Sequence, residues 1–245
     1  LQDPSQVIFR VKDHLEKTKP EEVEPVEGAT PGQTFVSGLE RSSSGDLDTI
    51  LGEGGQIGIR LNTSMSKRMT NKVVKNAKAG GNVFIEHGLY KPQDLAEARN
   101  AAEPFKIFFE SVDKLANAGV PYDQMTIVMP DVLDNPIETG KLWGEVQGKA
   151  KDWRAKGARI IFPLQTKDMK VDFDAFGAVW ANDDWQTGEN PVVIGIPGNF
   201  SGWTPAMLNE FLQKEEWVTR IHLLGVDPGG DRGKELMEVA RKARP

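Results

Sequence analysis

The sequence contains no cysteine, and this absence excludes several kinds of chemistry at once. Without thiols the chain can form no disulfide, no Cys-based zinc site, no iron–sulfur cluster and no thiol nucleophile. Histidine is also scarce: His14, His87 and His222 are the three in the chain, and no two of them stand at metal-ligand spacing. We therefore expect neither a metal centre nor a cofactor.

Long apolar runs are absent as well. None approaches the roughly 20 residues that a membrane-spanning helix needs, and the N-terminus has no signal-peptide pattern. We expect no membrane association, with the cytoplasm as the default compartment. The net charge of −6 gives no general attraction to nucleic acid or an anionic membrane, but it leaves room for a local basic patch. Because Leu1 stands where a start methionine would, we expect a processed chain or a piece of a longer one.

The chain divides by composition into two parts. Its 245 residues, 38% apolar and 27% charged, suit one large domain with a substantial core. Residues 1–55 are rich in Pro, Glu, Ser and Gly and resemble loop, apart from strand candidates at 7–11 and 34–39. We interpret 1–55 as an N-terminal extension that packs on a core domain, 56–245; whether it also contributes a strand stays open.

From Gln56 onward, short apolar runs alternate with helical patterns. The strand-like runs are QIGIRL (56–61), NVFIEHG (82–88), MTIVMPD (125–131), RIIFPLQ (159–165), AVWAND (178–183), VVIGIPG (192–198) and RIHLLGV (220–226). Nearly all of their residues are apolar, as expected of strands covered on both faces. Gly119 and Gly157 predict helix C-termini, and Thr204 followed by Pro205 predicts a helix start.

This alternation predicts parallel βα units, in a (β/α)8 barrel of the TIM type or in an open doubly wound sheet. The number of units favours the barrel, as does the lack of a Gly-rich phosphate-binding fingerprint after the first strand. No eighth strand follows Val226. Either the N-terminal extension supplies it or the barrel is incomplete.

Polar residues stand at nearly every predicted strand end, where the reactive groups of a barrel gather. They are Asn62, Glu86, His87, Asp131, Gln165, residues 182–184, the loop from Gly195 to Asn199, and Asp227. We expect them to share one pocket.

Other roles stay open for several of these residues. Asp131 and Asp227 would also suit a turn and a helix cap, His87 a structural histidine, and 183–184 a solvated loop pair. A buried amide without partners is costly, which favours a site role for Gln165. His222, inside a strand pattern, is interpreted as core.

Common catalytic signatures are missing: there is no G-x-S-x-G elbow, Walker loop or dinucleotide fingerprint. A hydrolase or lyase acting on a nucleoside or sugar remains open, with Glu86 paired with Asp131 or Asp227 as its two carboxylates. So does a non-catalytic barrel module that binds a base or a protein.

Five short segments occur in an order that resembles the tRNA-guanine transglycosylase superfamily, and within it the relatives that insert 7-deazaguanine bases into DNA. They are EHGLYK (with Glu86, Gly88 and Tyr90), IVMPDVLDNP (Asp131), IFPLQTK (Gln165), VIGIPGNFSGW (Gly195) and HLLGVDPGGDR. The resemblance extends from about Gln56 to Ala243.

The resemblance implies a base-exchange site. Asp131 and Gln165 would hydrogen-bond a guanine-type or deazapurine base, the loop from Gly195 to Asn199 would add backbone groups, and Tyr90 would stack. Glu86 would handle protons, and His87 could supply a second proton carrier. The family's nucleophilic Asp follows an eighth strand, and Asp227 is the nearest substitute here. Such chemistry needs a carboxylate nucleophile and a proton donor for the leaving base.

A DNA or tRNA substrate would also need a phosphate-binding surface. The candidates are Lys67, Arg68, Lys72, Lys75 and Lys78 on one predicted helix, and Arg232, Lys234, Arg241, Lys242 and Arg244 near the end of the chain. Both groups could equally be solvated helix faces.

Overall fold

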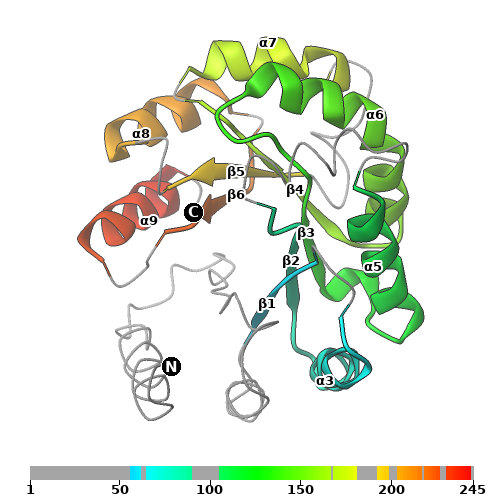
Figure 1. Ribbon diagram of the computed structural model, residues 1–245. Helices are drawn as coiled ribbons and strands as arrows, with labels where there is room; N and C mark the ends of the chain where they lie inside the picture. Colours follow the sequence, from blue (N-terminus) through cyan, green and yellow to red (C-terminus); the bar gives the residue numbers. More distant parts are fainter. Residues whose placement is uncertain are drawn as a thin grey trace, which may run out of the picture.

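The computed structural model describes residues 56–61, 65–89, 105–166, 168–180, 192–198, 203–216, 218–226 and 230–243. The predicted extension 1–55, with its two strand candidates, lies outside these ranges. Elements carry the labels of Figure 1.

The described residues form an α/β fold with six parallel strands in one sheet. The strands are β1 (Ile57–Arg60), β2 (Val83–Glu86), β3 (Met125–Val128), β4 (Arg159–Pro163), β5 (Val193–Pro197) and β6 (Ile221–Leu224). The helices between and after them are α3 (Lys67–Lys78), α5 (Lys106–Asn117), the short 3-10 helix η2 (Tyr122–Gln124), α6 (Pro136–Ala155), α7 (Met169–Trp180), α8 (Pro205–Lys214) and α9 (Asp231–Ala243).

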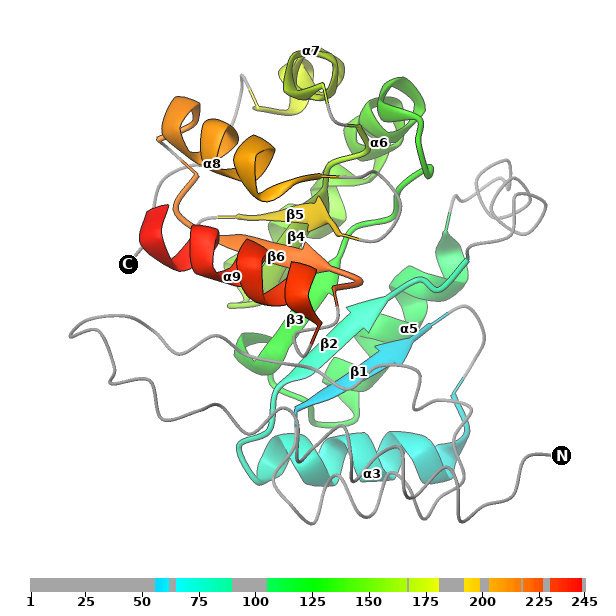
Figure 2. The same cartoon turned by 90° about the vertical axis from the view of Figure 1, so that its left-hand side faces the viewer.

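The strand order in the sheet is the order in the sequence, β1 to β6, and every neighbouring pair is parallel. When each new strand is added on the same side of the previous one, right-handed βαβ connections place all the helices on one face of the sheet. In a doubly wound sheet the strand order reverses at one point, and the helices then lie on both faces. The helices accordingly form an outer arc around the strands (Figure 1), and the side view shows α8 and α9 outside β5 and β6 (Figure 2). The described residues therefore form a half-barrel.

The two faces of the curved sheet carry different side chains, because successive residues of a strand point to opposite faces. Ile57, Ile59, Val83 and Ile85 face the helices, in one large core with α5, α6 and α8. The concave face holds a smaller apolar cluster: Phe84, Val128, Ile161 and Val193, with Leu224 against them.

Strands β2 and β6 meet across the concave side. The rings of Phe84 and His222 stack with centroids 5.0 Å apart and an interplanar angle of 25°. This stack, together with the apolar cluster beneath it, fills the middle of the half-barrel with side chains, as in barrel interiors generally. The sequence interpretation of His222 as a packed residue agrees with this position.

The predicted helix signals are confirmed where they are described. Thr204 caps α8 by accepting a hydrogen bond from the Met207 backbone N–H, and Pro205 is its first residue. Gly119 and Gly157 follow the ends of α5 and α6 with φ of +109° and +104°, a left-handed conformation that glycine adopts without strain.

The strand predicted at 178–183 is wrong for its first three residues, because Ala178, Val179 and Trp180 form the end of α7. A short apolar run cannot be assigned to strand or helix by periodicity alone, and here the helix continues through it. Residues 181–183 lie outside the described ranges.

Helices α6 and α7 pack unusually closely. Gly140 of α6 lies against the backbone of α7, where an added Cβ would be 2.2 Å from the carbonyl oxygen of Ala175. Gly144 and Gly148 follow at four-residue intervals on α6, yet nothing lies within 4 Å of a Cβ added at either position. Gly140 alone therefore allows the close approach that fixes α7 beside the end of β4.

Candidate functional site

Three predicted site residues, each following a different strand, are joined by hydrogen bonds. His87 follows β2, Asp131 follows β3 and Gln165 follows β4. His87 Nε2 lies 3.0 Å from Asp131 Oδ1, and Gln165 Nε2 donates to Asp131 Oδ2 at 2.8 Å. Because the strands are parallel, their C-terminal ends bring these side chains to one end of the half-barrel, as the sequence predicted.

His87 is held on the helix side of the sheet. It is 4% exposed, and its ring makes edge contacts with Phe105 and Phe108 at centroid distances of 5.5 and 6.5 Å. The Leu89 backbone N–H donates to Nδ1 at 3.0 Å, so the proton of a neutral ring lies on Nε2 and points to Asp131. In this arrangement His87 orients the Asp131 carboxylate.

Gln165 is fixed by a buried carboxylate that sequence reasoning missed. Asp172 of α7 is fully buried; its Oδ1 accepts from the Gln165 backbone N–H, and its Oδ2 accepts from both the N–H and the hydroxyl of Thr166. Burial raises the pKa of Asp172, and these three hydrogen bonds oppose the rise. An acidic residue in the first turn of a helix is ordinary in sequence, so nothing marked Asp172 in advance.

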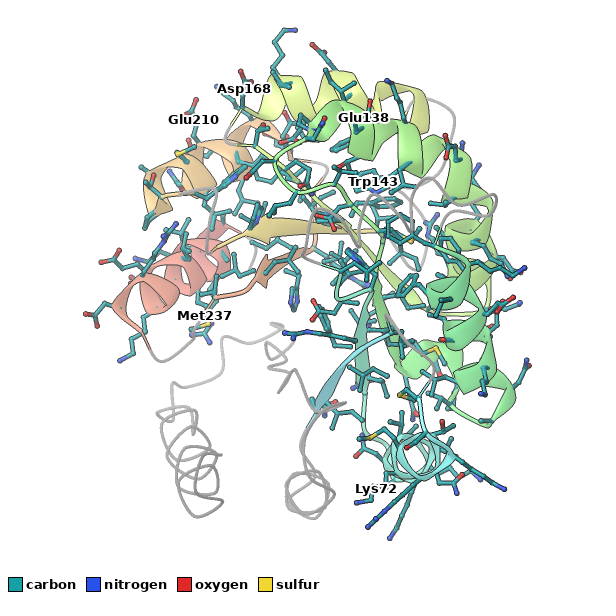
Figure 3. The ribbon with its side chains drawn as sticks, viewed as in Figure 1. Lys72, Glu138, Trp143, Asp168, Glu210 and Met237 are labelled. Carbon is teal, nitrogen blue, oxygen red and sulfur yellow. The ribbon has the colours of Figure 1, made fainter. Side chains whose placement is uncertain are left out.

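The loops around Asp131 and Gln165 are anchored to the helices. Trp143 Nε1 of α6 donates to the Pro130 carbonyl at 2.8 Å, and Figure 3 shows Trp143 on the inner side of its helix. The Thr139 hydroxyl accepts from the Val132 backbone N–H at 2.9 Å. Trp203 Nε1 donates to the Thr166 carbonyl at 2.9 Å. The polar chain is therefore held by buried groups on both sides.

Glu86 does not join this chain. Glu86 is two residues after Phe84 on β2, so its side chain points to the same, concave face. There Arg60 Nε of β1 donates to Glu86 Oε1 at 2.8 Å. Gly88, at φ +68°, lies over the stem of Arg60, because a Cβ there would be 2.7 Å from Arg60 Cβ. Adjacent residues of one strand point to opposite faces, and this separates the neighbours Glu86 and His87. Arg60 was also missed by the sequence reasoning.

Gly195 lies within β5 and not in a loop. Its carbonyl accepts from the Leu164 backbone N–H at 2.8 Å, and a Cβ at this position would be 2.7 Å from Leu224 Cδ1. The glycine therefore makes room for packing across the concave face. Tyr90, Asn199 and Asp227 lie outside the described residues.

Elsewhere on the concave face, burial lowers the pKa of His222 from 6.5 to about 4. Its imidazole is therefore neutral at pH 7 and contributes no charge to the interior.

Among the described residues, no group of three or more His, Asp or Glu side chains is arranged to hold a metal ion. None of the described helices is long and apolar enough to cross a membrane. Comparison of the chain with protein-family models, with curated proteins and with solved structures gave no match.

The polar chain at the end of the half-barrel presents hydrogen-bond acceptors. A carboxylate has about four lone-pair sites, and the bonds from His87 and Gln165 occupy two of those of Asp131, which is 20% exposed. Both Nε2 hydrogens of Gln165 are used, on Asp131 and on the Pro163 carbonyl at 3.2 Å. Flipping the amide would set its oxygen against two acceptors, so the hydrogen bonds fix the amide orientation and leave Oε1 as its acceptor atom.

Proposed function

We propose that this protein is a transglycosylase-like enzyme that exchanges a guanine-type base for a 7-deazaguanine in DNA or tRNA. The observation that carries the proposal is the hydrogen-bonded chain His87–Asp131–Gln165 at the C-terminal ends of three adjacent strands. Two of its members, Asp131 and Gln165, are the residues to which the family resemblance assigns base recognition.

The acceptors of this chain match the donors of a guanine edge. The pyrimidine ring of guanine carries N1–H and the 2-amino group side by side, a pair that one carboxylate can accept. Replacing N7 by carbon leaves that edge unchanged, so one site can hold both the leaving and the incoming base. His87 and Gln165 fix the orientation of the Asp131 carboxylate before the ligand arrives, and such preorganisation lowers the entropic cost of binding.

Base exchange also needs groups that act on the glycosidic carbon and on protons. A carboxylate attacks the sugar carbon as the bond to the base breaks, and the leaving base takes up a proton; the incoming base then loses a proton and displaces the carboxylate. Glu86, on the concave face beside Arg60, is the described candidate for the acid–base role. Asp227 is the candidate nucleophile as the nearest substitute for the family's Asp after an eighth strand, and His87 acts through Asp131.

The full fold proposed is an eight-stranded barrel. The stack of Phe84 on His222 supports it, because β2 and β6 are four strands apart and would lie opposite one another in a closed barrel of eight. A closed barrel of eight would have two more strands between β6 and β1.

A binding titration tests base recognition directly. Guanine and 7-deazaguanine are titrated by calorimetry into the wild type, Asp131→Asn and Asp134→Asn. Losing a charge-assisted hydrogen bond costs about 1.5 to 3 kcal/mol, so we expect Asp131→Asn to weaken binding about 10- to 100-fold. Asp134 is exposed in the same loop with φ of +55°, a conformation that asparagine adopts as well as aspartate, so Asp134→Asn is the matched control.

Exchange itself is measured by incubating labelled guanine with guanine-containing tRNA and DNA. Incorporation into either polymer supports the proposal, and release of base without incorporation would identify a hydrolase instead. Failure of both bases to bind the wild type, or equal weakening by the two variants, would overturn it.

A further inference from the structure

Helix α3 differs in charge from the rest of the molecule. The segment 54–85 contains no Asp or Glu but six basic residues, Arg60, Lys67, Arg68, Lys72, Lys75 and Lys78, of which the last five lie on α3. The whole chain carries −6, so the remaining residues carry −12. A strongly basic helix in an acidic protein is not explained by overall composition.

These cations share one side of the helix. At 100° per residue the five α3 positions fall within an arc of about 140°, on the side opposite Val73 and Ala77, which are buried in the core. Figure 3 shows Lys72 on the side of α3 turned away from the strands. With a rise of 1.5 Å per residue the basic face is about 16 Å long from Lys67 to Lys78.

Other helices balance their lysines locally. Lys156 pairs with Asp152, Lys214 with Glu210 and Lys242 with Glu238, each four residues apart. The basic residues of α9 also share their helix with acidic ones, because α9 carries Asp231, Glu235 and Glu238. Helix α3 has no acidic residue of its own to play this part.

We propose that the basic face of α3 is a docking surface for the phosphate backbone of a nucleic acid. Residues three or four apart on a helix stand about 5–6 Å from one another, so the face offers a regular row of cations to a regular row of phosphates. An anionic membrane is the weaker alternative. Interfacial helices insert an apolar face, whereas that of α3 is packed on the sheet, and the exposed large apolar residues of the described chain lie on other segments.

The position of α3 connects this surface with the candidate site. The helix follows β1, so its N-terminal end with Lys67 and Arg68 lies at the same end of the half-barrel as Asp131 and Gln165. A strand whose base enters the site could run its backbone along α3. Only this path rests on the proposed function; the docking surface itself rests on charge and geometry.

The test replaces the three outermost lysines together. The variant Lys67→Gln/Lys75→Gln/Lys78→Gln keeps helix propensity, and the control Lys156→Gln/Lys170→Gln/Lys214→Gln removes the same charge from lysines outside both candidate phosphate-binding groups. Binding of labelled single-stranded DNA and of tRNA is followed by fluorescence anisotropy between 50 and 200 mM salt. For single strands each phosphate contact contributes about −0.7 to the slope of log K against log salt. The α3 variant should therefore lower the magnitude of the slope by about 2 and weaken binding at least 10-fold.

Every other outcome overturns the inference. These are no binding of DNA or tRNA by the wild type, an unchanged slope in the α3 variant, and equal loss in both variants. In a parallel sedimentation assay with phosphatidylserine vesicles, an α3 variant that loses vesicle binding but keeps DNA and tRNA binding would indicate a membrane surface instead. Asp131→Asn separates the base-exchange proposal from the docking proposal. It should weaken base binding but leave the slope of log K against log salt for DNA and tRNA at its wild-type value. If no base binds while DNA or tRNA still binds through α3, the enzymatic proposal fails and the docking surface stands.

Discussion

Substitution of three glycines in α6 by alanine tests the α6–α7 packing from which the site is built. Alanine is favoured over glycine in a helix by about 1 kcal/mol, so each substitution gains that much where space exists. At exposed Gly144 and Gly148 a Cβ meets nothing within 4 Å, and we expect gains in unfolding free energy of about 0.5 to 1 kcal/mol. At Gly140 the new Cβ would be 2.2 Å from the Ala175 carbonyl oxygen, a rigid backbone atom.

Relief of that overlap requires α7 to move, and overpacking of this kind costs about 1 to 3 kcal/mol or more. After the propensity gain, Gly140→Ala should still lower the unfolding free energy by about 1 to 2 kcal/mol. Urea denaturation of the three variants measures these values, and for a chain of this size each kcal/mol shifts Tm by about 2–4 °C. The reasoning is refuted if Gly140→Ala is as stable as Gly144→Ala.

Two further predictions concern ionisable groups, partly buried His222 and fully buried Asp172. The lowered pKa of His222 means that the folded protein binds fewer protons than the unfolded chain between about pH 4 and 6.5, so stability falls as pH falls through that window. His222→Phe should reduce the loss of unfolding free energy between pH 7 and pH 4 by about 2–3 kcal/mol. Urea denaturation of wild type and variant at several pH values measures this, and an equal loss of unfolding free energy in both proteins would contradict it. Asp172→Asn sets an amide NH2 against a backbone N–H donor and should lower the unfolding free energy by about 2 kcal/mol. The exposed control Asp174→Asn should change it by no more than about 0.5 kcal/mol. Equal melting temperatures of the two variants would contradict the role of Asp172 in holding Gln165.

Much of the architecture could be predicted from the sequence because buried parallel strands and capped helices leave local signals. The runs around Ile57, Val83 and Met125 are strands as predicted, and Thr204 caps its helix. The run 178–180 was mistaken for a strand because Ala, Val and Trp at the end of a helix can have the same composition as a strand. Only tertiary packing distinguishes the two.

The site could be predicted in part. Strand-end position was enough to group His87, Asp131 and Gln165, because parallel topology brings those ends together. It could not reveal that Glu86 faces the concave side, since this depends on strand register. Nor could it reveal Asp172, whose contact with Gln165 depends on how α7 packs beside α6 and β4.

The Phe84–His222 stack also restricts how any ligand can travel. Glu86 is two residues beyond Phe84 on the same face, about 7 Å nearer the polar end, so the Glu86–Arg60 pair lies between the stacked rings and that end. The stacked rings occupy the middle of the half-barrel. In the proposed base exchange, the leaving and incoming bases would therefore both use the polar end, one after the other.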